Sequence, residues 1–397
     1  MTPLFRPVAL GIYGLFCLVG FVGALVLPTL SMFLAKEVGV RPLLVSIPFG
    51  GIAIASIFYN YIIGHWSDNL QDRRPLVAAC CLVGAVACAF LAHSRDYWVV
   101  ATTVVFLFSL SMVAFSQVMA YSLDYAEHNI PSNRVPLFNA IVRAQIAIAW
   151  VAGPPVGFLL AHFLGFTFMY WVAAGMYAVV AVSCIKFLPR LDSHSRHIVT
   201  VNDDELQPLN STHKRALWLS LLGFSLMWAA NNAYQISMPL HLKDNLGIGT
   251  EWLGWVMGSS ALLEIPFMLL AGHYAARVSI ISMIKLAGFS ALSLYLSIYF
   301  ATALWQLFAL QIFNAVFIGI LAGLGVSIIQ QLLPGRSGVA SALYTNTTHM
   351  GSSISSLLVA GVAEIYGYHQ VFLVNLLIVA LAIFSFGCVK ISAPALR

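Results

Sequence analysis

The chain has 397 residues, of which 60% are hydrophobic and only 8% are charged. Soluble domains carry about 25% charged residues, so this composition excludes a water-soluble enzyme, a nucleic-acid-binding protein and a secreted domain. A helix that crosses a bilayer needs roughly 20 apolar residues, and we therefore expect an all-α integral membrane protein. The apolar runs predict twelve spans, at about 8–34, 43–66, 75–93, 97–123, 135–163, 166–188, 216–242, 250–272, 279–301, 303–332, 337–364 and 368–390.

One polar segment interrupts this series of spans. Residues 191–215 hold four acidic side chains and lie between the sixth and seventh spans. We expect residues 1–190 and 216–397 to form two six-helix bundles, with 191–215 as a cytoplasmic linker. Of the 19 Lys and Arg residues, fourteen fall on the side of the two termini and four on the opposite side. Because basic loops stay in the cytoplasm, both termini are expected there.

The two predicted halves resemble each other in sequence. The segment 34–39 ends the first span and is similar to 242–247, which ends the seventh. Gly64-His65 and Gly272-His273 end the second and eighth spans, again 208 residues apart. A parallel repeat of two six-helix halves is similar to the plan of a major-facilitator transporter. We therefore expect the major-facilitator fold.

The loop after the second span carries a candidate conformational latch. Gly64, Asp68, Arg73 and Arg74 fit the loop signature of major-facilitator transporters, whereas Asn69, Gln71 and Asp72 depart from it. The glycine permits close helix approach, and the arginines can meet a helix C-terminus or a nearby carboxylate such as Asp124. Such contacts would hold the cytoplasmic side in one state. The alternative is ordinary anchoring of the loop by its basic residues.

The fifth span contains Gly153, Pro154 and Pro155. Proline kinks a helix, and glycine lets a neighbouring helix pack closely. The motif resembles the Gly-Pro motif of major-facilitator exporters. Prolines also occur in other spans, so a generic transmembrane kink is the alternative interpretation.

Two charges are expected deep within the membrane. Arg143 in the fifth span and Glu264 in the eighth each lie roughly 12 Å from a helix end. Buried charges normally pair or line a wet cavity. Trp150 follows Arg143 by two helical turns, and an indole can stack on a sugar ring while a guanidinium binds its hydroxyls. We predict a sugar site at these three residues; a purely structural ion pair between the halves is the alternative.

Uncharged polar side chains extend this candidate site. They are natural ligands for hydroxyl groups, although bonding between helices is an equally good interpretation of each one. The predicted ligands are Asn231, Asn232 and Gln235 in the seventh span, Gln311 and Asn314 in the tenth, and Gln117 in the fourth.

The chain resembles the bacterial sugar efflux transporters, the Set or Sot family. The similar segments are 143–155, 23–31, 226–228, 258–266, 311–320 and 334–336. The resemblance implies proton-driven export of lactose, glucose and simple glycosides across a bacterial inner membrane. The spacing of Arg143, Trp150 and Glu264 is also similar to that in lactose permease. The acid and histidine on span ten of that permease are missing here. We therefore expect Glu264 to carry the proton, with Asp124 as the second candidate.

Three other functions stay open at this point. One is a multidrug exporter of the same fold, one a proton–sugar symporter and one a membrane-embedded enzyme. The last would need a nucleophile and base, or metal ligands, at one depth, and the scattered histidines give none. We expect no enzyme activity, no cofactor and no metal. The expected partners are sugar, protons and the lipid bilayer, without nucleic acid, and the protein is expected to be a monomer.

Overall fold

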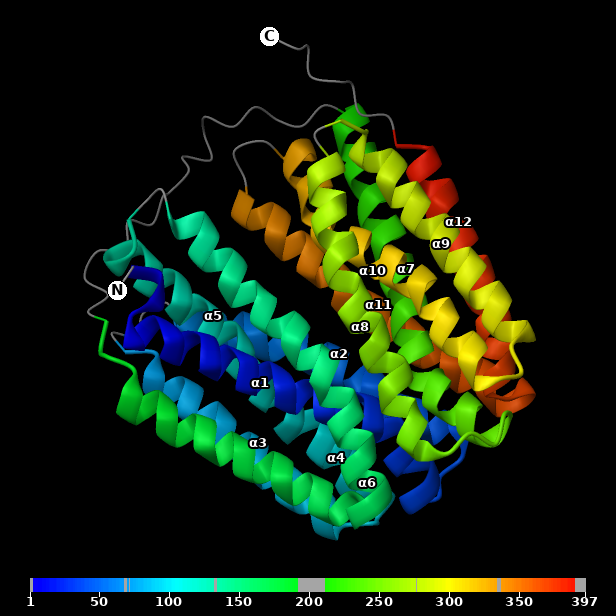
Figure 1. Cartoon of the computed structure of the whole chain (residues 1–397), viewed down its shortest axis with the longest axis horizontal. Helices are drawn as coiled ribbons and strands as arrows, with labels where there is room; N and C mark the ends of the chain where they lie inside the picture. Colours follow the sequence, from blue (N-terminus) through cyan, green and yellow to red (C-terminus); the bar gives the residue numbers. More distant parts are fainter. Residues whose placement is uncertain are drawn as a thin grey trace. The chain divides into compact units, whose positions relative to one another are not determined.

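The computed structural model describes residues 3–67, 70, 72–131, 134–191, 211–275, 277–333 and 337–389. Every regular element in these ranges is a helix (Figure 1). The α-helices are α1 Pro7–Met32, α2 Pro42–Ser67, α3 Arg74–His93, α4 Tyr97–Thr102, α5 Ser109–Asn129, α6 Val135–Phe187, α7 Ser211–Asp244, α8 Thr250–Tyr274, α9 Ile280–Phe300, α10 Leu304–Leu332, α11 Ser337–Tyr366 and α12 Val371–Gly387. Two π-helical turns, η2 Phe33–Glu37 and η3 Thr103–Phe108, continue α1 and join α4 to α5.

Nine helices in the described part of the chain are long and apolar enough to cross a membrane. The protein is therefore an all-α, multi-pass membrane protein, as its composition predicts. One of the nine, Leu137–Phe187, covers two predicted spans. The backbone of α6 is non-helical between them, at Gly165, where φ is 82°. α7 and α11 are also long but are less apolar and stand outside the nine. The count of twelve spans stays a prediction.

The backbone carries the internal repeat that the sequence indicates. Four described residues adopt a positive φ, and all are glycines. Gly39 (72°) and Gly247 (64°) are 208 residues apart and precede α2 and α8. Gly165 (82°) and Gly367 (84°) have nearly the same ψ, 161° and 167°. Because only glycine adopts this conformation without strain, the same turns are specified at corresponding places in the two halves.

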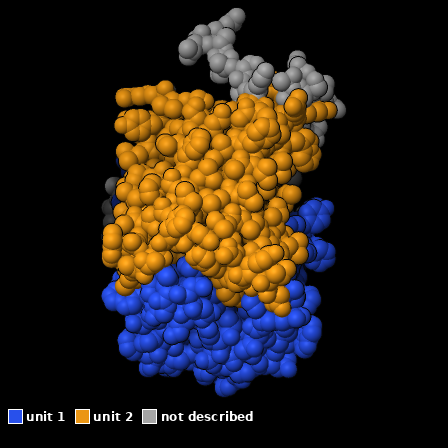
Figure 2. Space-filling view, turned by 90° about the vertical axis from the view of Figure 1, so that its right-hand side faces the viewer, with its two compact units in different colours: residues 1–196, 239–262 blue, residues 197–238, 263–397 orange. Residues whose placement is uncertain are grey.

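The chain forms two compact units (Figure 2). Unit 1 comprises residues 1–196 with 239–262, and unit 2 comprises 197–238 with 263–397. The end of α7 and the first part of α8, residues 239–262, thus belong to unit 1; we call this segment the α7–α8 tip. Most of the expected linker 191–215 lies outside the described residues. The division into bundles 1–190 and 216–397 stays a prediction.

Within unit 1, α6 is packed between α1 and the α7–α8 tip through glycines. A Cβ on Gly153 would lie 2.6 Å from the Cβ of Ala24 in α1, so the absence of a side chain allows α1 to approach. On α8, a Cβ on Gly254 would lie 2.5 Å from the carbonyl oxygen of Pro154, and one on Gly258 would lie 2.7 Å from Pro155 Cγ. The glycine–proline motif is therefore a packing surface for two helices.

Candidate functional site

A buried polar cluster in unit 2 joins α7 to α10. Tyr234 Oη donates to Gln311 Oε1 at 3.1 Å, and Asn314 Nδ2 donates to the same oxygen at 3.3 Å. Gln311 and Asn314 are three residues apart, which brings side chains together on one helix face. Gln311 Nε2 donates to the Leu307 carbonyl at 2.9 Å, and the residue is fully buried. The Gln311 amide is therefore occupied by protein groups on both sides.

Asn314 differs from Gln311 in one respect. Its Oδ1 atom is buried and has no hydrogen-bond partner among the described residues. A buried acceptor without a partner is costly, so this oxygen is suited to accept a hydrogen bond from a bound hydroxyl group. On α7, Asn231 lies three residues before Tyr234 and is also buried, whereas Asn232 and Gln235 are half-buried. These three predicted ligands lie within three residues of Tyr234 on α7, whereas Gln311 and Asn314 are the two predicted ligands that make the cluster's bonds.

Tyr234 is a member of this cluster that the sequence analysis missed. It lies one helical turn after Asn231 and next to Gln235, and both of these were selected because they are amides. A tyrosine in an apolar helix is usually part of the core, so its type alone carries little signal. The spacing from Asn231 could have indicated it, because residues three apart share a helix face.

Glu264 lies on α8 in unit 2 and is half-buried. A Cβ on Gly319 of α10 would lie 3.0 Å from the Glu264 carbonyl oxygen and 3.0 Å from the Met268 nitrogen. The glycine therefore lets α10 approach α8 directly at Glu264. A second glycine, Gly323, approaches Met268 in the same way. This small-residue stripe fixes the carboxylate's helix against the helix that carries Gln311 and Asn314.

Arg143 and Trp150 lie on α6 in unit 1. Trp150 is half-buried, and the side chain of Arg143 lies outside the described part of the structure. The expected pairing of Arg143 with Glu264 therefore stays a prediction. α6 places the two residues two turns apart on one helix.

Arg73 is the centre of a second polar cluster, in unit 1. Its side chain is buried at the start of α3. Nη1 donates to Ser67 Oγ at 2.7 Å and to Gln117 Oε1 at 2.8 Å, and Nε donates to Asp124 Oδ2 at 3.3 Å. The contact between an arginine of this loop and Asp124 is present as expected. Gln117, expected as a sugar ligand, and Asp124, the second proton candidate, here both bind Arg73.

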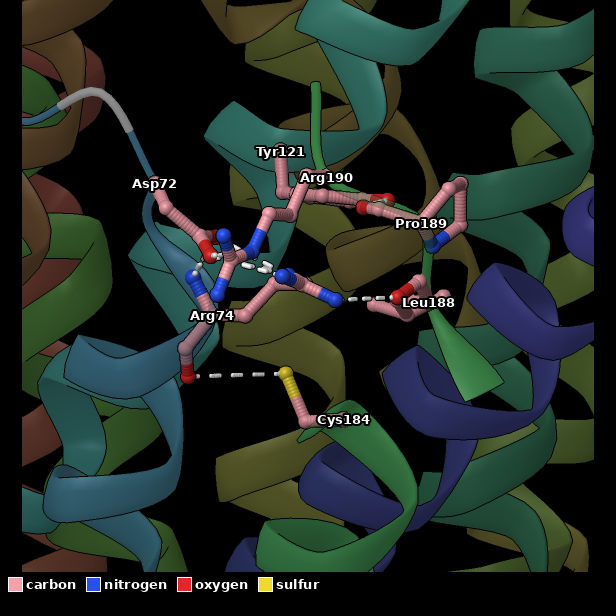
Figure 3. A network of polar contacts seen from close by, with 7 residues as sticks. All are labelled: Asp72, Arg74, Tyr121, Cys184, Leu188, Pro189 and Arg190. Atoms are coloured by element: carbon pink, nitrogen blue, oxygen red, sulfur yellow. Dashed lines mark hydrogen bonds and ion pairs between the residues drawn. The ribbon is translucent and has the colours of Figure 1, made fainter. Parts of the chain in front are cut away.

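Arg74 and Asp72 form a third cluster (Figure 3). Arg74 Nε and Nη2 bind the Asp72 carboxylate at 2.9 and 2.7 Å, and Nη1 donates to the Leu188 carbonyl at 2.6 Å. Arg190 approaches Asp72 at 3.7 Å. Tyr121 Oη donates to the Pro189 carbonyl at 2.9 Å. Together these contacts tie the α2–α3 loop and α5 to the end of α6.

The electrostatics of this cluster depend on Asp72. The side-chain hydrogen bond from Arg74 lowers the pKa of Asp72, and burial opposes this only in part. Asp72 also accepts the backbone N–H of Arg74, the first residue of α3, at 3.0 Å, which satisfies one of the free donors at this helix start. In the sequence, Asp72 appears only as a departure from the loop signature. An acid two residues before a helix that begins Arg-Pro is a capping signal that could have indicated it.

The predicted latch has two more residues, Asp68 and Gly64, about which the structure shows less. Asp68 lies outside the described residues. A Cβ on Gly64 would meet no described atom within 4 Å, and the role of this glycine stays a prediction.

Comparison with known proteins gives a consistent result. The family model of the Major Facilitator Superfamily matches residues 12–302. The chain is 38% identical to sugar efflux transporter A of Dickeya chrysanthemi and 37% identical to sugar efflux transporter C of Escherichia coli K12. The alignments cover 91% of this chain and 91% of the first relative, and 89% of this chain and 89% of the second.

A solved structure shows the same fold. The crystal structure of the nucleoside transporter NupG superimposes with a TM-score of 0.80 at 14% identity, covering 96% of this chain and 98% of that one. The chain belongs to the Major Facilitator Superfamily, a superfamily of transporters, and within it to the bacterial sugar efflux transporter family. It is therefore a transporter and not an enzyme.

Proposed function

We propose that the protein exports sugars, namely lactose, glucose and simple glycosides, from the bacterial cytoplasm by proton antiport with alternating access. Its relationship to sugar efflux transporters over about nine-tenths of both chains carries this proposal. The buried amides of α7 and α10 support it, because they offer donors and acceptors without charge, as sugar hydroxyls require. The membrane is the bacterial inner membrane, both termini are cytoplasmic, and the working unit is a monomer.

The sugar site we propose has two parts. Arg143 and Trp150 on α6 are proposed to bind the sugar, the guanidinium through its hydroxyls and the indole through the ring face. Glu264 on α8 and the amides of α7 and α10 are proposed to bind further hydroxyls. Among these amides, Asn314 is the one with a buried acceptor still available, whereas Gln311 holds it in place. A sugar bound here would replace the missing partner of Asn314.

The proton carrier we propose is Glu264. Asp124, the second candidate, is engaged by the buried Arg73, whose Nε lies 3.3 Å from Asp124 Oδ2. Glu264 has no such ion pair with a described residue. In the cytoplasm-facing state, the deprotonated carboxylate binds sugar. In the outward-facing state, protonation removes an acceptor for the hydroxyls, the sugar leaves, and the proton is carried inward.

The loop between α2 and α3 has a supporting role in this cycle. We propose that Gly64, Asp68, Arg73 and Arg74 form the cytoplasmic latch, with Asp124 as a partner of Arg73. The loop is fastened to α5 and to the end of α6 by hydrogen bonds and ion pairs. Gly153, Pro154 and Pro155 supply the kinked packing surface of α6.

Transport into proteoliposomes in which the cytoplasmic face of the protein points outward tests the function directly. The purified protein, reconstituted and energised with an acidic interior, is expected to accumulate radiolabelled lactose or a methyl glycoside. Collapsing the pH gradient should stop accumulation. A lipophilic cation that competes with the glycoside would favour the multidrug alternative. Accumulation with the opposite gradient would favour the symporter.

A further inference from the structure

An ion pair joins the α7–α8 tip to the end of α1. Lys36 Nζ contacts Asp244 Oδ1, and both residues are exposed. The two positions are 208 residues apart, which is the offset of the internal repeat. Gly39 follows Lys36 by three residues and Gly247 follows Asp244 by three, each with a positive φ. The pair therefore forms where the same turn of the two repeats meets.

The Lys36 side of this contact is held in place by its neighbours. Arg95 Nε binds Glu37 Oε2 at 3.2 Å, and Arg95 Nη2 donates to Thr167 Oγ1 at 3.0 Å. The guanidinium also lies 5.0 Å from the ring centre of Phe33. These contacts connect the end of α1 to α6 and to the turn before α4. The partner that can separate is therefore the α7–α8 tip.

A second pair joins the tip to α6. His162 Nδ1 lies 2.6 Å from Thr250 Oγ1 and 3.6 Å from Glu251 Oε2. Glu251 Oε2 is buried and makes no hydrogen bond within the part of the chain that is described. A Cβ on Gly249 would lie 2.2 Å from Glu251 Oε1, so the glycine leaves room for the carboxylate to fold back over the turn.

We propose that Lys36–Asp244 and His162–Glu251 form an outer gate, which keeps the α7–α8 tip on α1 and α6 while sugar enters from the cytoplasm. The proposal rests on the orientation and transport proposed above. Further along α8, beyond Glu251, the tip contacts α6 through Gly254 and Gly258, which have no side chains to interlock. Separation of the tip therefore breaks two ion pairs and a smooth helix contact.

The histidine makes the gate responsive to the outside pH. Protonation of His162 would complete its ion pair with Glu251, so an acidic exterior favours the closed gate. The gate would then close after sugar has left and a proton has bound. The other charged or titratable side chains in and beside the contacting turns are Lys36, Glu37, Arg41, His93, Arg95, Asp96, His241, Lys243 and Asp244.

A charge exchange tests the first pair. Lys36→Asp and Asp244→Lys each place like charges together, and the double variant restores opposite charges. Spin labels on turns 37–41 and 245–249, in a cysteine-free background, report the distance by double electron–electron resonance. Exposed pairs are weak, so each single variant is expected to raise the separated population by roughly two- to fivefold. The double variant should return to the original distribution.

Lys243→Asp is the matched control, because it reverses a charge on the adjacent exposed residue and leaves the pair intact. Its distance distribution should not change. A double variant that stays as open as the single variants would overturn the gate. So would single variants that leave the distribution unchanged. The proposed function is tested separately, because the distance measurement needs no sugar. If the unaltered protein does not transport glycosides, the proposed function is overturned, whatever the distances show.

The second pair is tested by pH. In the unaltered protein the separated population should fall as pH is lowered from 8 to 5, and His162→Gln should abolish this dependence. His93→Gln, which changes an exposed histidine at the end of α3, should retain it. A His162→Gln variant with an unchanged pH profile would remove His162 from the gate.

Discussion

Trp150 tests the sugar site at the scale of a single side chain. Replacing it with alanine removes the indole that is proposed to stack on the sugar ring, and stacking contributes about 0.5–1.5 kcal/mol between aromatic rings. We expect Trp150→Ala to weaken glycoside binding by roughly two- to tenfold, measured by isothermal titration calorimetry in detergent. Trp218→Ala is the control, since Trp218 is 72% exposed near the start of α7. An unchanged affinity for Trp150→Ala would remove Trp150 from the site.

Gln311 tests the division of roles within the unit 2 cluster. Gln311→Ala removes three hydrogen bonds and leaves Tyr234 Oη without its acceptor. An unsatisfied buried group costs about 1–3 kcal/mol, so a lower unfolding temperature is expected in detergent. Asn346→Ala, at an exposed amide of α11, should leave it unchanged. Equal unfolding temperatures for the two variants would mean that Gln311 does not support the cluster.

At the scale of elements, the α2–α3 loop has a pH-dependent stability. Because the hydrogen bond from Arg74 lowers the pKa of Asp72, its carboxylate stabilises the folded state at neutral pH. This stabilisation is present above the ordinary pKa of the group, about 3.9, and is lost as the pH falls below it. Asp72→Asn should therefore be less stable than the unaltered protein at pH 7, with the difference shrinking toward pH 3.

Thermal unfolding across this pH range measures the effect. Glu127→Gln, at an exposed carboxylate near the end of α5, is the matched control and should cause no comparable loss at pH 7. A constant difference between Asp72→Asn and the unaltered protein at all pH values would contradict the linkage.

The contact between α1 and α6 is tested by two glycines on one helix. Gly153→Ala places a Cβ 2.6 Å from Ala24 Cβ and 3.0 Å from the Ala24 carbonyl carbon, so α1 must shift. Overpacking of this kind costs about 1–3 kcal/mol, and a lower unfolding temperature is expected. Gly175→Ala should be tolerated, because no described atom lies within 4 Å of its Cβ. Equal tolerance at both positions would contradict the close packing.

At the scale of the whole molecule, Glu264 tests the coupling of export to protons. Glu264→Gln keeps the size of the side chain and removes its titration. We expect it to abolish accumulation driven by a pH gradient while sugar exchange at equal concentrations continues. Glu127→Gln should retain both activities. If Glu264→Gln still accumulates glycoside against its gradient, another group carries the proton.

The fold could be predicted because each span carries its own signal. α3 and α9 are continuous apolar runs, and their bounds lie within a few residues of the predictions. The repeat was also visible, because Gly39 and Gly247 are required by the backbone itself. α6 shows the limit: the only interruption between its two predicted spans is the non-helical backbone at Gly165, so the spans follow each other almost without a loop.

The sites could be predicted less well, because their chemistry is decided by contacts between helices. Gln117 and Gln311 look alike in the sequence, yet the first binds Arg73 and the second binds Tyr234. Residue type identifies a polar group, whereas only the packed structure shows which neighbour satisfies it. Gly254 was missed for the same reason, since its partner Pro154 lies far away in the chain.

The Lys36–Asp244 pair has a consequence for the history of the chain. If the two halves descend from one duplicated gene, positions 36 and 244 once held the same residue. Two identical charges at that place would repel each other, so the ancestral copies could not have made this contact. The attraction requires that at least one of the two positions changed its residue after duplication. Sequence divergence between the repeats would then have created the bond.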